Sequence, residues 1–176
     1  MATPWDIVYY KTADGSVPVF EYYVDACTST LIAYLNSVLD AVAAAPPPAF
    51  SGGGRWEAMH GGMGGFYEVR ATGPNRRQHR LFCVLENGEP DELTTRGLPR
   101  PAIAVITGMW KPNATLFGAA DYAAVSAMGV DYRAQFPRRV AADADVDAFL
   151  DRLEKKAAES DSTQTKAGRK RRTKQE

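Results

Sequence analysis

The chain has 176 residues, 45% of them hydrophobic, which suits one compact domain with an ordinary core and short extensions. No apolar segment reaches the ~20 residues of a membrane-spanning helix, and the opening MATPWDIVYY lacks the basic and apolar regions of a signal peptide. The net charge of zero hides an uneven distribution. Residues 1–150 carry four more acidic than basic side chains, and residues 151–176 carry four more basic than acidic ones. Charge alone therefore excludes residues 1–150 as a general nucleic-acid binder.

The N-terminal third predicts one strand and two helices. Aromatic and β-branched residues at 5–10 favour a strand that ends before the turn Asp14-Gly15. Ser16 and Pro18 predict the start of a helix of about two turns, and Thr28 or Ser29 the start of a second. The second helix has an apolar face at helical spacing and ends at three consecutive prolines. That face consists of Leu31, Leu35, Val38, Leu39 and Val42.

The middle of the chain predicts a β-hairpin beside a third strand. Residues 66–70 and 79–85 have strand patterns on either side of the turn Gly73-Pro74-Asn75, which favours an antiparallel pair. A polar connection, residues 86–100, leads to the apolar run 103–110, whose composition is typical of a central strand. We expect the hairpin 66–85 and the strand 102–110 to lie side by side.

The C-terminal part predicts two helices and a disordered tail. One helix is expected over 116–127, ended by Gly129, and an amphipathic helix over 145–158. From residue 160 onward the chain lacks apolar anchors, which predicts disorder. The expected organisation is a domain at 1–140, a helix at 141–159 and a disordered basic tail at 160–176. The fold class is α+β: a small, mainly antiparallel twisted sheet with the two N-terminal helices on one face and the other face partly open.

Several kinds of active site find no support in the residue patterns. The two histidines, His60 and His79, do not stand in a metal-binding motif, so we expect no metal and no cofactor. Cys27 and Cys83 lie far apart without a redox motif, which fits a reducing cytoplasm. The glycine-rich stretches lack the Lys-Ser/Thr ending of a phosphate-binding loop and are interpreted as flexible connectors.

A cluster of basic and aromatic residues on the hairpin and the third strand is the remaining pattern. Neighbouring strands would bring these residues to one end of the sheet, and cations beside flat rings are typical of single-stranded RNA binding. The alternative is that these arginines only keep the hairpin soluble, and that Tyr67 belongs to the core. The cluster comprises Tyr67, Arg70, Arg76, Arg77, His79, Arg80, Trp110 and Lys111.

The same region resembles the RelE/HigB toxin superfamily, in particular its phage Gp49-like branch. That family carries a motif of the form L-x-G-G-L-W/Y-E-L-R, a turn, and an arginine that opens a strand; here the motif reads MGGFYEVR at 63–70, followed by RLFCV at 80–84. An apolar strand ending near Lys111 and a following helix are similar too. The resemblance covers roughly residues 5–130. It departs at Lys111-Pro112, where the family has paired lysines, and in the longer insertion 86–100.

The resemblance implies a ribosome-dependent endoribonuclease that cuts mRNA without a metal ion. In such a reaction the RNA 2′-hydroxyl attacks the adjacent phosphate. By that resemblance Arg70 and Arg80 stabilise the phosphate and Lys111 acts as a second cation or proton donor. His79 is a candidate acid–base by residue type. Arg76, Arg77, Tyr67 and Trp110 are the expected RNA-binding residues. The implied partners are mRNA on the ribosome and an antitoxin protein, in the cytoplasm and without a membrane.

Two other functions stay open from the sequence. One is a catalytically inactive protein that keeps the RelE-like fold and binds a partner, such as a phage factor that acts on a host protein. The other is an RNA-binding module driven mainly by the basic tail. Convergence of Arg70, Arg80 and Lys111 would favour the enzyme, whereas an arginine held in a carboxylate pair far from Lys111 would favour the binding protein.

Overall fold

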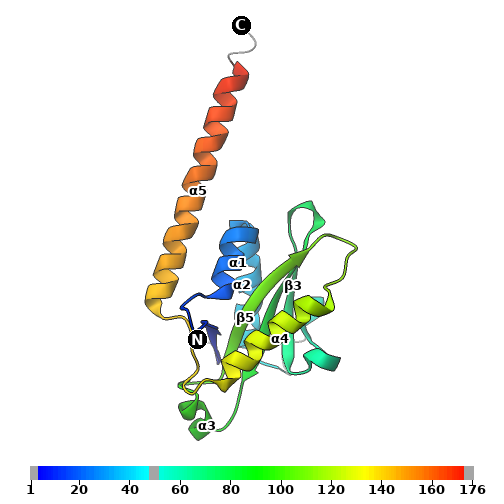
Figure 1. The fold of residues 1–176 in the computed structure, drawn as a ribbon, viewed down its shortest axis with the longest axis vertical. Coiled ribbons are helices and arrows are strands. Elements are labelled where there is room, and N and C mark those ends of the chain that lie inside the picture. The colour runs from blue at the N-terminus through cyan, green and yellow to red at the C-terminus, as the bar shows by residue number, and fades with distance from the viewer. Residues whose placement is uncertain (1–3, 48–51, 173–176) are drawn as a thin grey trace. The chain divides into compact units, whose positions relative to one another are not determined.

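The computed structural model describes residues 4–47 and 52–172 and divides the chain into two compact units, 1–141 and 142–176. The first unit has the α+β class that the sequence predicts, and it is built on one five-stranded sheet (Figure 1). The second unit consists of one long helix, α5. Among the described residues, no helix has the length and apolar character needed to cross a membrane.

The sheet has the strand order β1-β5-β4-β3-β2. The predicted hairpin forms from β3 and β4, and β4 also pairs antiparallel with β5, so the expected neighbours lie side by side. The edge strand β1 is parallel to β5, and the short β2 extends the other edge. The sheet is therefore mixed, with three antiparallel pairs and one parallel pair. The strands are β1 (Asp6–Tyr9), β2 (Trp56–Ala58), β3 (Phe66–Thr72), β4 (Gln78–Glu86) and β5 (Ala102–Lys111).

The two N-terminal helices cover one face of this sheet, as expected. They are α1 (Pro18–Ala26) and α2 (Ser29–Ala44), which contact β5 and β3 respectively. The hydroxyl of Thr28 accepts a hydrogen bond from the backbone N–H of Leu31 (3.2 Å) and caps α2, whereas Ser16 does not cap α1, which begins after Val17. Leu35, Leu39 and Val42 of the predicted apolar face are fully buried.

The opposite face is partly covered by α4 (Ala119–Ala134), which crosses the sheet in Figure 1. Beneath it lies a core that includes Phe66, Phe82 and Tyr132. The sequence predicted that Gly129 ends this helix, but the helix continues for five residues beyond it. Gly129 instead allows close packing, because a Cβ there would lie 2.4 Å from the ring of Phe66.

Two short elements were not predicted from the sequence. The connection 86–100 contains a helix, α3 (Pro90–Thr95), whose N-cap Glu89 and Glu92 form a capping box. The glycine-rich stretch after residue 55 contains β2 and a 3₁₀ turn, Gly61–Met63. Both elements are shorter than the stretch of sequence needed to recognise hydrophobic periodicity, so the sequence pattern did not reveal them.

The tail differs from the expectation of disorder. The last helix, α5, runs from Asp143 to Arg172, so residues 160–172 are helical, and residues 173–176 lie outside the described part of the chain. The segment lacks proline and is rich in Lys, Arg and Gln, which are good helix formers. Extending an existing helix costs far less than nucleating one, so this segment continues the helix without a hydrophobic anchor.

Candidate functional site

Arg70 and Arg80 are the centre of the candidate site. They are direct partners in the β3–β4 register, which puts both side chains on the same face of the sheet, the face that carries α4. Directly opposite residues have Cβ atoms about 4.5–5.5 Å apart, so the two guanidinium groups start from adjacent positions. The expectation that these arginines approach each other across the hairpin is met.

Two carboxylates bind this arginine pair. Glu68, two residues before Arg70 on the same face, accepts a hydrogen bond from Arg70 Nε at 2.6 Å and lies 3.5 Å from Arg80 Nε. Glu57, on β2, is the register partner of Glu68 and lies 2.8 Å from Arg70 Nη2. The side chain of Glu68 is only 9% exposed, whereas that of Glu57 is 43% exposed. Glu68 therefore binds the arginines from a buried position, whereas Glu57 binds Arg70 at the surface.

Lys111 lies on the same face, at the end of β5. Arg80 is opposite Met109 in the β4–β5 register, and Lys111 is two residues further along. It is thus the diagonal neighbour of Arg80, about 7–8 Å away by strand geometry. Its ammonium lies 5.1 Å from the centre of the Phe117 ring. The sheet therefore brings Arg70, Arg80 and Lys111 to one end of one face.

Tyr122, near the start of α4, completes the surroundings of Arg80. Burial lowers the pKa of Arg80 below its ordinary value, while the nearby charge of Glu68 acts in the opposite direction, as do Tyr122 and Glu57. The guanidinium stays charged at neutral pH because the ordinary arginine pKa lies far above it. The Arg80 side chain is only 13% exposed, and a permanently charged cation in such surroundings is suited to binding a phosphate.

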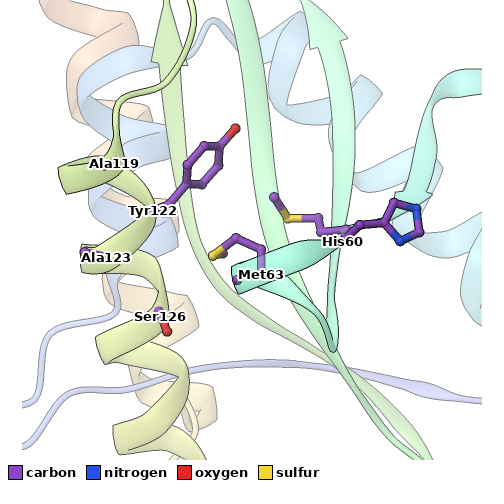
Figure 2. Close-up of a pocket in the computed structure, with 8 residues that line it drawn as sticks. His60, Met63, Ala119, Tyr122, Ala123 and Ser126 are labelled. Carbon is purple, nitrogen blue, oxygen red and sulfur yellow. The ribbon is translucent and has the colours of Figure 1, made fainter.

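A cleft of about 580 Å³ opens next to Tyr122. Figure 2 shows Tyr122 projecting from α4 across the strands, Met63 facing the helix, Ala123 and Ser126 further along α4, and His60 on the far side with its ring directed away from the helix. Its lining is mainly apolar, with the histidine ring and the serine hydroxyl as polar groups. No sequence pattern links Tyr122 or this cleft to the arginines, because α4 and the sheet come together only in the folded chain.

His79 is not brought to this site. It alternates with Arg80 along β4 and so faces the helices on the opposite side of the sheet, where it is 1% exposed. Its Nδ1 lies 2.5 Å from the hydroxyl of Tyr22, a residue of α1. Burial lowers the pKa of His79, and Arg77 and Arg80 lower it further. A role as the acid–base group beside Arg80 does not fit this position.

The expected RNA-stacking residues also lie away from the arginine pair. Tyr67 is on the face that carries α1 and α2, and it stacks on Trp56 with ring centroids 5.1 Å apart. Trp110 pairs with His79 on that same face and is 38% exposed. The guanidinium of Arg77 lies 4.0 Å from the Trp110 ring centre, and Arg76 is exposed in the hairpin turn. Arg77 and Trp110 therefore lie together at the hairpin end of this face, whereas Tyr67 lies four residues away along β3.

A glycine within a strand, such as Gly108 in β5, can let a ligand backbone approach the sheet. In the fold it is covered instead, because a Cβ at this position would lie 2.1 Å from the ring of Tyr22. The glycine therefore allows α1 to pack closely on β5. Among the described residues there is no group of three or more His, Cys, Asp or Glu side chains arranged to hold a metal ion.

Of the residues that sequence reasoning missed, Glu68 carried a usable signal. It stands two residues before Arg70 in a predicted strand, and strand alternation alone puts both side chains on one face. Glu57 carried none, because its position depends on the register of the short β2. Comparison with protein-family models, with curated proteins and with solved structures found no match to this chain.

Proposed function

We propose that this protein is a ribosome-dependent endoribonuclease of the RelE/HigB type that cuts messenger RNA without a metal ion. The observation that carries the proposal is the arginine pair Arg70–Arg80, directly opposite across a hairpin, with Lys111 on the same face. Such clustering of cations is what a phosphate with growing negative charge requires. The strand, two helices, hairpin, strand and helix of the first unit also follow the order that the resemblance implies.

In the proposed reaction the attacking 2′-hydroxyl loses a proton and the departing 5′ oxygen gains one. The 2′-hydroxyl oxygen attacks phosphorus while the bond to the 5′ oxygen breaks, which leaves a 2′,3′-cyclic phosphate and a 5′-hydroxyl. Glu57, the exposed carboxylate of the group, accepts the proton of the 2′-hydroxyl. Lys111 donates a proton to the departing oxygen. Arg70 and Arg80 stabilise the charge on the remaining phosphoryl oxygens.

Glu68 has a positioning role in this proposal. Its carboxylate contacts both arginines and is almost fully buried, so it is poorly placed to reach a substrate. Two like charges directly opposite each other destabilise a sheet, and a carboxylate between them offsets that repulsion. Glu68 thereby keeps the guanidinium groups in place before RNA arrives, which lowers the reorganisation that the reaction requires.

The second candidate is a catalytically inactive protein of the same fold that binds a partner. The observation in its favour is that Arg70 already has two carboxylate partners, Glu57 and Glu68. Those pairs reduce the positive charge that a phosphate would meet at the site.

Induced expression in a bacterial host separates the two candidates. The endoribonuclease arrests growth, and transcript 5′ ends then show new cuts within translated regions. A binding protein gives no new transcript ends, whether or not growth slows. Growth arrest with an unchanged set of transcript ends would therefore favour the second candidate.

A further inference from the structure

The cleft beside Tyr122 has the composition of a small-molecule site. Met59, Met63 and Tyr122 supply its apolar surface, and His60 and Ser126 supply its polar groups. Its volume of about 580 Å³ falls within the range of ~300–1,000 Å³ that is usual for ligand pockets. Methionine thioethers are polarizable and make favourable contacts with aromatic rings. A flat, weakly polar ring system fits such a lining.

Two elements, β2 and α4, connect this cleft to the arginine pair. The backbone N–H of Met59 donates to the carbonyl of Phe66 at 2.9 Å, which extends the β2–β3 ladder by one residue. Met59 therefore lies on the same face as Glu57, two residues away, and Glu57 contacts Arg70. On the helix side, Tyr122 lines the cleft and also lies near enough to Arg80 to raise the pKa of its guanidinium.

We propose that this cleft binds a nucleobase of single-stranded RNA, adjacent to the phosphate held by Arg70 and Arg80. The inference rests on the proposed function and adds a base-binding subsite to it. Each nucleotide joins a flat ring to a phosphate, and here an apolar cleft with an aromatic wall adjoins a pair of arginines. RNA-binding proteins commonly stack unpaired bases on aromatic side chains and bind the base edges by hydrogen bonds. Ser126 and His60 are the groups available for that edge.

The test measures binding rather than activity. The probe is a short fluorescein-labelled single-stranded RNA with 2′-O-methyl groups, which removes the attacking hydroxyl and prevents cleavage. Each nucleotide in turn is replaced by an abasic one, and affinity is measured by fluorescence anisotropy. Three full-length proteins are compared: wild type, Ala123→Trp, which fills the cleft, and Ala124→Trp. Ala123 and Ala124 are both exposed on α4, but only Ala123 lines the cleft, so the second variant is a matched control.

We expect the wild-type protein to lose about tenfold in affinity at one abasic position, a typical loss for one stacked base. Ala123→Trp should bind the intact RNA about tenfold more weakly and be insensitive to that abasic position, whereas Ala124→Trp should match the wild type. Equal affinity of Ala123→Trp and the wild type would overturn the subsite, as would a wild type that is insensitive to every abasic position.

Cleavage of unmodified mRNA on ribosomes, followed in parallel, separates this inference from the proposed function. If the wild type shows the expected abasic pattern but cuts no RNA, the endoribonuclease proposal fails and the subsite stands. If the wild type cuts RNA and the two tryptophan variants bind alike, the subsite fails and the endoribonuclease proposal stands.

Discussion

Arg70 and Arg80 are unusual as a pair because like charges directly opposite on neighbouring strands normally destabilise a sheet. Here Glu68 contacts both, at 2.6 Å from Arg70 Nε and 3.5 Å from Arg80 Nε. With Glu57, which pairs with Arg70, four charged side chains gather on neighbouring strands at this end of the sheet. We interpret this arrangement as a site selected for binding an anion.

The arginine pair leads to a prediction about growth inhibition. Arg70→Ala or Arg80→Ala should abolish it, because removing one charge-directed interaction with the reacting phosphate commonly costs ~10²–10³ in rate. Lys111→Ala should weaken it. Growth after induction is measured for each variant, with folding checked by circular dichroism. Full toxicity of both arginine variants would show that the site lies elsewhere.

The matched control for these variants is Arg100→Ala. Arg100 forms an exposed ion pair with Asp6 just before β5, at the opposite end of that strand from Lys111, and exposed pairs contribute at most ~1 kcal/mol. Arg96, in the connection 86–100, is the obvious alternative as a neutral control. It is not one, because Arg96 lies 2.8 Å from the buried carboxylate of Glu86.

Because His79 is buried, we predict that the free energy of unfolding depends on pH. Its folded-state pKa is lowered, chiefly by burial, so at mildly acidic pH the unfolded chain binds the proton more tightly than the folded chain. The stabilisation that the neutral His79 side chain adds to the folded state is therefore fully present above the ordinary pKa of about 6.5. It is lost as the pH falls from there toward the folded-state pKa. The free energy of unfolding in urea should decline over that range.

His79→Gln supplies the comparison, since it removes the titration and keeps a polar side chain opposite Tyr22. The variant should show a shallower decline in the free energy of unfolding between about pH 7 and pH 5 than the wild type. Identical pH slopes for the two proteins would mean that His79 is not the group responsible.

At the scale of elements, Glu86 joins three segments that are distant in sequence. It ends β4, is 3% exposed, and pairs with Arg96 after α3 at 2.8 Å and with Arg138 after α4 at 2.6 Å. The side chain of Arg138 is itself only 6% exposed. This buried network fixes the connections that follow α3 and α4 against the end of the sheet.

We predict that Glu86→Ala lowers the free energy of unfolding by ~3–5 kcal/mol, because it leaves a buried arginine without its carboxylate. Asp91→Ala, at an exposed position of α3, should change it by less than about 1 kcal/mol. Chemical denaturation of both variants checks the difference. A decrease for Glu86→Ala no larger than that for Asp91→Ala would show that the network contributes little.

Local patterns predicted the elements whose determinants are local. The hairpin turn and the alternation in 66–70 and 79–85 identify β3 and β4, and Thr28 identifies the start of α2. The true end of α4 was not predictable in this way. It depends on Phe66 packing against Gly129, a contact between residues far apart in sequence, and the usual helix-ending role of glycine gave the wrong boundary.

At the scale of the whole molecule, the charge split of the sequence does not follow the two compact units, because residues 142–176 carry nine basic and eight acidic side chains. The basic excess is confined to residues 160–176, with six basic and two acidic side chains, while the candidate site lies in the first unit. The composition of the tail predicted its charge correctly and its conformation incorrectly, because the lack of apolar residues excludes a core but not the extension of a helix.

The tail leads to a prediction about salt dependence. Deletion of residues 160–176 should weaken RNA binding at low salt and have little effect at high salt, because its cations act by releasing counterions from RNA. For single-stranded RNA, the slope of log affinity against log salt becomes shallower by about 0.7 for each phosphate that the tail no longer neutralises. Affinity measured across a salt series checks this. Unchanged affinity at both ends of the series would exclude a role of the tail in RNA binding.

The most direct test of the central claim is the chemistry of the RNA ends. Purified wild-type protein is added to ribosomes translating a defined mRNA without added divalent metal beyond what the ribosomes require, and the fragments are analysed for 2′,3′-cyclic phosphate and 5′-hydroxyl ends. We predict such fragments for the wild type and for Arg100→Ala, and none for Arg80→Ala. A wild type that yields no fragments, or an Arg80→Ala variant that cuts as well as the wild type, would contradict an endoribonuclease site built on Arg70 and Arg80.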